Sequence, residues 1–182
     1  MDRGVLKQKL ESKDFNKHNM DTINSVCDIL LRDNKERQLT IATEEMAELI
    51  QELTKYLRGI GNDLGIKEEI ADAFLVVNIV GKAGNEHSKI DFDDEDIMNM
   101  SPFETKDKRF VCHLIIGMTE FMKIVQHSLY DNSNAGRTET YEIFDLLKAL
   151  VSYMGYDWGE IRDIIDIKVD RQLEKIKTGT VV

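Results

Sequence analysis

A single proline, Pro102, is the feature of this 182-residue chain that most limits what it can fold into. Proline removes a backbone donor and interrupts helices, and here the eleven glycines lie mainly between stretches of helical periodicity. Most of the sequence can therefore form long uninterrupted helices. We predict an all-α fold, an antiparallel helical bundle with about six main helices in two related halves.

Apolar residues at helical spacing give the expected elements. A short N-terminal helix is expected near residues 5–10, and Asp21 is expected to cap a second helix that ends near Asn34. Asp157 and Glu160, three residues apart, form the capping pattern of the last helix. The remaining helices are expected at residues 38–58, 66–82, 107–130, 138–154 and 158–177.

An acidic connector is expected to join the two halves. We predict one compact domain made of a first helical half at 1–83, a connector at 84–106 and a second half at 107–182. The connector contains the acidic run at residues 93–96 together with Pro102. Because this run lacks the spacing of an EF-hand loop, a solvated connector is favoured over a calcium site.

The charge balance limits the partners of the chain. It has 24 Lys and Arg against 34 Asp and Glu, a net charge of −10, which argues against binding to a nucleic acid polymer. No N-terminal region resembles a signal peptide, and no apolar run is long enough to span a membrane. We therefore expect a cytoplasmic protein without a membrane partner.

Cysteine, histidine and glycine patterns offer little alternative chemistry. Cys27 and Cys112 both lie in apolar helical contexts and are expected to be buried thiols. None of the four histidines has a glutamate three residues before it, which disfavours a ferritin-like di-iron site. Gly59 and Gly61 predict a helix end and a turn, not a phosphate-binding loop.

Two pairs of carboxylates mark the segment that begins at Glu45. Glu45 and Glu48 are three residues apart, as are Glu69 and Asp72, so each pair lies on one face of a helix. Two such helices folded against each other through a short connection would bring the four carboxylates together. Glu44 points away from the apolar stripe of its helix and is expected to be solvated.

These carboxylates are expected to require a cation. The helix that carries Glu69 and Asp72 is apolar almost all round, and an uncompensated buried carboxylate is costly. Basic residues are scarce nearby, since Lys55 and Arg58 lie at the far end of the first helix. Hard oxygen ligands with few basic partners favour Mg²⁺, with Mn²⁺ as the alternative.

At these positions the sequence resembles the MazG-like, all-α nucleoside triphosphate pyrophosphatase superfamily, which includes the dimeric-type dUTPases. The family signature is E-x-x-E, a variable spacer and E-x-x-D, which matches Glu45, Glu48, Glu69 and Asp72 within residues 38–82. The resemblance implies an enzyme that cleaves a nucleoside triphosphate between the α and β phosphates. It also implies Mg²⁺ held by the four carboxylates, with Glu45 or Glu48 orienting or deprotonating the attacking water.

The last helix carries a basic stripe. Lys168, Arg171 and Lys175 share one flank of this helix, where such residues are usually only solvated. In the MazG-like family, a Lys and an Arg three apart on the C-terminal helix contact the triphosphate. The resemblance therefore makes Lys168 and Arg171 the first candidates for phosphate binding, with Lys175 and Lys55 as further candidates.

The second half contains a degenerate copy of the carboxylate pattern. Two of its segments align with the two carboxylate segments, with Lys123 in the position of Glu48. We interpret this as an internal duplication, with a chance match as the alternative. In the copy, an ammonium would replace the metal ion and neutralise the three remaining carboxylates: Glu120, Glu142 and Asp145.

Other interpretations stay open. Within the enzyme class, the alternative is a dUTPase-like specificity, for which Asn78, Trp158 and Tyr56 could form a base pocket, although each also fits a core or surface role. Outside it, the chain could be a catalytically silent helical interaction module or a non-enzymatic divalent-cation binder. The resemblance implies a homodimer as one assembly, and the duplication allows a single chain that imitates a dimer.

Overall fold

The computed structural model describes residues 2–84, 107–131 and 137–179, and this part of the chain is all-helical, as predicted. No strand occurs in these ranges. The predicted connector at 84–106 lies outside the described residues, apart from Gly84. The helices are α1 (Arg3–Ser12), α2 (Met20–Leu57), α3 (Asp63–Gly84), α5 (Lys108–Asp131), α6 (Arg137–Met154) and α7 (Trp158–Lys177).

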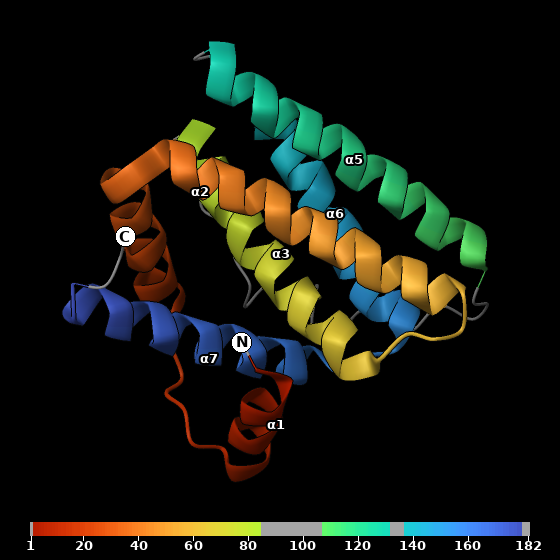
Figure 1. Ribbon diagram of the computed structural model, residues 1–182, viewed down its shortest axis with the longest axis horizontal. Helices are drawn as coiled ribbons and strands as arrows, with labels where there is room; N and C mark the ends of the chain where they lie inside the picture. The colour runs from red at the N-terminus through yellow and green to blue at the C-terminus, as the bar shows by residue number, and fades with distance from the viewer. Residues whose placement is uncertain (1, 85–106, 132–136, 180–182) are drawn as a thin grey trace.

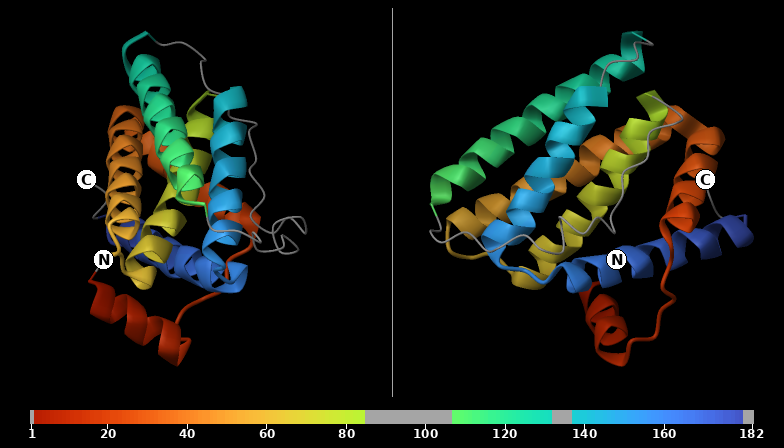
Figure 2. Two further views of the ribbon diagram at one scale, coloured as in Figure 1. Left: turned by 90° about the vertical axis from the view of Figure 1, so that its right-hand side faces the viewer. Right: turned by 180° about the vertical axis from the view of Figure 1, so that it is seen from behind.

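Four helices lie alongside one another, and a fifth crosses the end of the group. Helix α2 contacts α3 and α5, and α3 also contacts α6 and α7 (Figure 1). Helix α7 runs across one end of these four, and α1 lies against the outer side of α7 (Figure 2). Among the described helices, the two that carry the carboxylate motifs, α2 and α3, pack against each other most extensively.

Helix α2 bends sharply at Asn34. The backbone there is extended, with φ −158° and ψ 92°, and Asn34 Oδ1 accepts a hydrogen bond of 2.9 Å from the Arg37 amide. The predicted helix end near Asn34 is thus confirmed as a break that begins a new helix. The predicted cap at Asp21 is wrong, because Asn19 caps the helix by accepting from the Thr22 amide at 2.9 Å.

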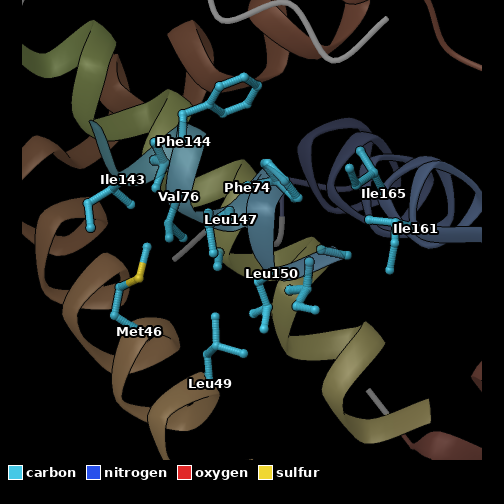
Figure 3. Packing of buried hydrophobic residues seen from close by; sticks show 14 of the residues in the cluster. Met46, Leu49, Phe74, Val76, Ile143, Phe144, Leu147, Leu150, Ile161 and Ile165 are labelled. Atoms are coloured by element: carbon cyan, nitrogen blue, oxygen red, sulfur yellow. The ribbon is translucent and has the colours of Figure 1, made fainter. Parts of the chain in front are cut away.

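The hydrophobic core is formed by buried residues of α2, α3, α5, α6 and α7, and Figure 3 shows the part of it around α3. Phe74 of α3 is fully buried at its centre and meets the rings of Phe144 and Trp158 edge to face, at 5.3 and 5.1 Å between centroids. Burying a side chain of this size stabilises the fold by about 1.5–3 kcal/mol. This core fixes α3, and with it one of the two carboxylate pairs.

The two cysteines differ in exposure. Cys27 is buried as predicted, but the prediction for Cys112 is wrong, because this thiol lies on the exposed face of α5.

Across the described ranges, no helix is both long enough and apolar enough to cross a membrane.

The carboxylates of the predicted duplicate lie on exposed faces of α5 and α6. Lys123 pairs with Glu120 at 2.7 Å, whereas Asp145 pairs with Lys148 of its own helix at 2.6 Å. These are contacts between residues three apart at the surface, where each charge takes its nearest partner. Lys123 therefore does not gather the three carboxylates as expected, and the duplication itself stays a prediction.

Candidate metal centre

Three of the four predicted ligands converge between α2 and α3. One carboxylate oxygen from each of Glu45, Glu48 and Glu69 lies within 4.8 Å of the others. Met46 and Leu49, which alternate with the two α2 carboxylates, are fully buried and fix that face of the helix against the core. The three-residue spacing on each helix therefore brings the carboxylates together, while the neighbouring Glu44 is exposed as predicted.

The fourth predicted ligand, Asp72, pairs with a lysine. The Lys168 ammonium contacts Asp72 Oδ2 and also lies 3.6 Å from Glu68 Oε1. The Lys168 side chain is only 9 % exposed, so this ion pair is screened little by water. The structure thus places Lys168, a predicted phosphate ligand, at the carboxylate cluster, where its ammonium is paired with Asp72 and Glu68.

The donor set fits a divalent cation. Glu69 is buried, and its Oε2 has no hydrogen-bond partner among the described residues. A buried oxygen left without a partner costs about 1–3 kcal/mol, and a bound cation would remove this cost. Carboxylate oxygens are the ligands that Mg²⁺ and Mn²⁺ prefer. Glu45, Glu48 and Glu69 could therefore hold such an ion, with Asp72 beside them.

The electrostatics of the cluster also favour a cation. Burial raises the pKa of Glu45 to about 7, assisted by the charge of Asp72 and, more weakly, by Glu48 and Glu69, while Lys168 acts in the opposite direction. Burial and the charges of Asp72 and Glu48 raise the pKa of Glu69 to about 7. Burial also raises the pKa of Asp72, although Lys168 opposes it. Burial and the neighbouring carboxylates thus disfavour the ionised forms, which a bound cation would stabilise.

A second charged group beside this cluster was missed by the sequence analysis. Arg3 Nη2 lies 2.8 Å from Glu52 Oε1, and Arg3 Nε lies 3.4 Å from Glu68 Oε2. Lys55, a predicted phosphate ligand, pairs with Glu52 at 2.9 Å. Although burial acts to raise it, the pKa of Glu52 is held below its usual value by hydrogen bonds from Arg3 and Lys55. The spacing of Glu52, four residues after Glu48, was the available signal.

A cavity of about 140 Å³ lies next to the carboxylates, between both parts of α2, α3 and α7. Glu45 and Asp72 line it, and so do Arg37 and Lys175. Arg37 is eight residues before Glu45, which is about 12 Å along a helix. The cavity therefore joins an acidic end to a basic end, and its walls between them are apolar: Ile23, Val26, Ile41, Val76, Ile79 and Val169.

The basic end is formed by Arg37 and Lys175, and Arg171 of α7 lies near Lys175 but lines a different cavity. Burial lowers the pKa of Lys175, and the positive charges of Arg171 and Arg37 lower it further. In the part of the chain that the structure describes, none of these three side chains forms an ion pair. Arg171, a predicted phosphate ligand, is exposed, and Lys175 is half-buried. Arg37 was missed because nothing in its local sequence marks it.

The three candidates for a base pocket are dispersed. Asn78 is fully buried and donates a hydrogen bond of 3.2 Å to Asn24 Oδ1. Trp158 packs in the core against Phe74, and Tyr56 lies at the C-terminal end of α2. The structure does not bring these side chains together, because Asn78 and Trp158 have separate partners in the interior and Tyr56 lies at the end of α2.

Comparisons of the chain with protein-family models, with curated proteins and with solved structures found no match. The relation of the candidate metal centre to MazG-like enzymes remains a resemblance in sequence.

Proposed function

We propose that the protein is a Mg²⁺-dependent nucleoside triphosphate pyrophosphohydrolase, which converts a nucleoside triphosphate into the monophosphate and pyrophosphate. The observation that carries this proposal is the convergence of Glu45, Glu48 and Glu69 beside a cavity with a basic far end. A metal-binding end and a basic end suit the phosphates of a metal-bound nucleotide. An antiparallel, MazG-like arrangement of α2 and α3 belongs to the same proposal.

Each residue has a role in this reaction. Glu45, Glu48 and Glu69, with Asp72, would hold the ion, and Glu45 or Glu48 would orient the attacking water or accept its proton. When bound, Mg²⁺ would supply positive charge to the phosphate oxygens and make a coordinated water more acidic. Lys168, fixed on Asp72, would add positive charge beside the reacting phosphate.

The cavity, of about 140 Å³, would hold phosphates that the metal does not bind. The amides of Gln38 and Gln172, which line it, can donate hydrogen bonds to phosphate oxygens. Arg37 and Lys175 would neutralise negative charge that the metal leaves uncovered.

The test is pyrophosphate release from a panel of canonical and modified ribo- and deoxyribonucleoside triphosphates, with Mg²⁺ and with EDTA. Glu69→Gln and Glu45→Gln should abolish release. Glu44→Gln is the matched control, because it removes the same charge from an exposed neighbour on the same helix and should leave release unchanged.

The outcomes separate the alternatives. Release that needs Mg²⁺ and is lost in Glu69→Gln supports the proposal, and the ranking of bases separates dUTPase-like from broad specificity. Metal binding without release from any member of the panel would instead indicate a cation binder. Neither binding nor release would indicate a helical interaction module.

A further inference from the structure

The cavity beside the metal centre is too small to enclose a nucleoside. Its volume is about 140 Å³, whereas pockets that enclose ligands larger than a few atoms have roughly 300–1,000 Å³. At about 10–15 Å³ for each water-sized group, it has room for roughly ten such groups, which is about the size of a pyrophosphate. A base with its ribose would have to lie outside.

Gln38 lines this cavity with a buried amide that lacks a partner. The residue is 6 % exposed, and its side chain forms no hydrogen bond among the residues that the structure describes. Buried polar side chains normally have a hydrogen-bond partner, and an unmade bond is costly. Because the amide nitrogen of Gln38 can only donate, a ligand oxygen in the cavity would supply the missing partner.

Positive charge surrounds this amide. Gln38 and Arg37 lie in the first turn of the second part of α2, which Asn34 caps, and the positive end of a helix dipole favours an anion. Lys175 of α7 lines the same cavity. Burial and the charges of Arg171 and Arg37 lower the pKa of Lys175, so these cations repel one another. An anion between Arg37 and Lys175 would relieve this repulsion, and the apolar walls would strengthen its attraction by excluding water.

The metal centre lies at the boundary between the cavity and solvent. Glu45 lines the cavity, whereas Glu48 does not line it and is exposed. A substrate at this boundary can place one part inside the cavity and leave the rest outside. The side chains considered for a base pocket, Asn78, Trp158 and Tyr56, do not line the cavity either.

We propose that the protein recognises the pyrophosphate part of a nucleoside triphosphate and not its base. The β and γ phosphates enter the cavity, where they bind Arg37, Gln38 and Lys175, and the nucleoside stays outside. This inference rests on the proposed function and deepens it: the specificity is broad in the base and strict in the phosphate chain.

The test is calorimetry on the full-length protein with Mg²⁺ and a set of non-hydrolysable ligands. The α,β-methylene analogues of four deoxyribonucleoside triphosphates should have Kd values that agree within about tenfold, because no pocket encloses the base. Imidodiphosphate, which has no nucleoside, should bind and displace these analogues. The nucleoside monophosphates should bind at least about tenfold more weakly than imidodiphosphate. A wider spread among the bases, or no binding of imidodiphosphate, would overturn the proposal.

Gln38→Met locates the phosphates within the cavity. It keeps the length of the side chain but removes the donor, so it should raise the Kd of imidodiphosphate by about tenfold. Gln51→Met is the matched control, because it removes an amide from an exposed position of the same helix and should leave this Kd unchanged. An unchanged Kd in a folded Gln38→Met would also overturn the proposal; if this variant does not fold, the ligand series on the wild type alone decides.

Binding of these ligands does not depend on turnover. A protein that binds imidodiphosphate and all four analogues but releases no pyrophosphate would refute the proposed reaction and leave this inference standing. Release of pyrophosphate together with strong selection of one base would support the reaction and overturn the inference.

Discussion

Lys168 shows how one buried side chain can hold two charges in place. It pairs with Asp72 and Glu68, and its side chain is 9 % exposed. Lys168→Met keeps the aliphatic stem but leaves both carboxylates without this partner, which should lower the free energy of unfolding by about 3–5 kcal/mol. Urea denaturation in EDTA measures this loss. Lys177→Met, at an exposed position of the same helix, should change it by less than about 0.5 kcal/mol.

The raised pKa values of Glu45 and Glu69 predict a pH dependence of stability. Both lie near 7 in the folded protein, against about 4.3 in an unfolded chain. Between these values the folded state binds more protons than the unfolded state, so the stability of the metal-free protein should fall as pH rises from about 5 to about 8. The measurement is the Tm in EDTA across this range.

The double variant Glu45→Gln, Glu69→Gln removes both titrating groups and should show a flatter dependence of Tm on pH. Saturating Mg²⁺ should have a similar effect, because the ion competes with the protons and stabilises the ionised carboxylates. A wild-type Tm that falls with pH no more steeply than that of the double variant would contradict this assignment.

At the scale of elements, the break in α2 determines the shape of the site. Asn34 ends the first part of the helix, which covers the cavity, and caps the second part, which carries Glu45. Asn34→Ala removes the cap on the Arg37 amide and should lower the free energy of unfolding by about 1 kcal/mol, whereas Asn34→Asp should keep it. Urea denaturation measures both. Asp33→Ala, at an exposed neighbouring position, is the control, and an equal loss there would contradict the role of the cap.

Local periodicity predicted these elements well. The helices, the break near Asn34 and the cap at Asp157 depend on residues within one or two turns of each other, and that information is present in the sequence. The same holds for the carboxylates of Glu45, Glu48 and Glu69, since the three-residue spacing sets their common face.

Contacts between distant segments could not be predicted in this way. The contact of Arg3 with Glu52 spans 49 residues, and that of Lys168 with Asp72 spans 96. Nothing in the local sequence of a basic residue tells whether its charge faces solvent, a carboxylate or a ligand. These partners follow from how α1 and α7 dock on the other helices.

At the scale of the whole molecule, the basic end of the cavity stands out against the charge of the chain. The protein carries a net charge of −10, which repels a polyanion at a distance. A triphosphate would therefore depend on charges gathered locally. Arg37 comes from α2 and Lys175 comes from α7, so this basic end exists only when the two helices meet.

Removing one charge from this end should weaken nucleotide binding without affecting the metal. Arg37→Gln and Lys175→Gln should each raise the Kd of a non-hydrolysable nucleoside triphosphate analogue by roughly tenfold, the effect of losing one charge-assisted hydrogen bond. Affinity for Mn²⁺ alone should not fall, because Arg37 lies about two helical turns from Glu45 and Lys175 is on a helix without a proposed metal ligand. Calorimetry with the analogue and with Mn²⁺ measures both values. Lys177→Gln removes an exposed charge from the same helix and should change neither Kd.

Two outcomes would contradict this prediction. If Arg37→Gln and Lys175→Gln bind the analogue like wild type, the phosphates lie elsewhere. If only Mn²⁺ binding weakens, Arg37 and Lys175 support the metal centre instead.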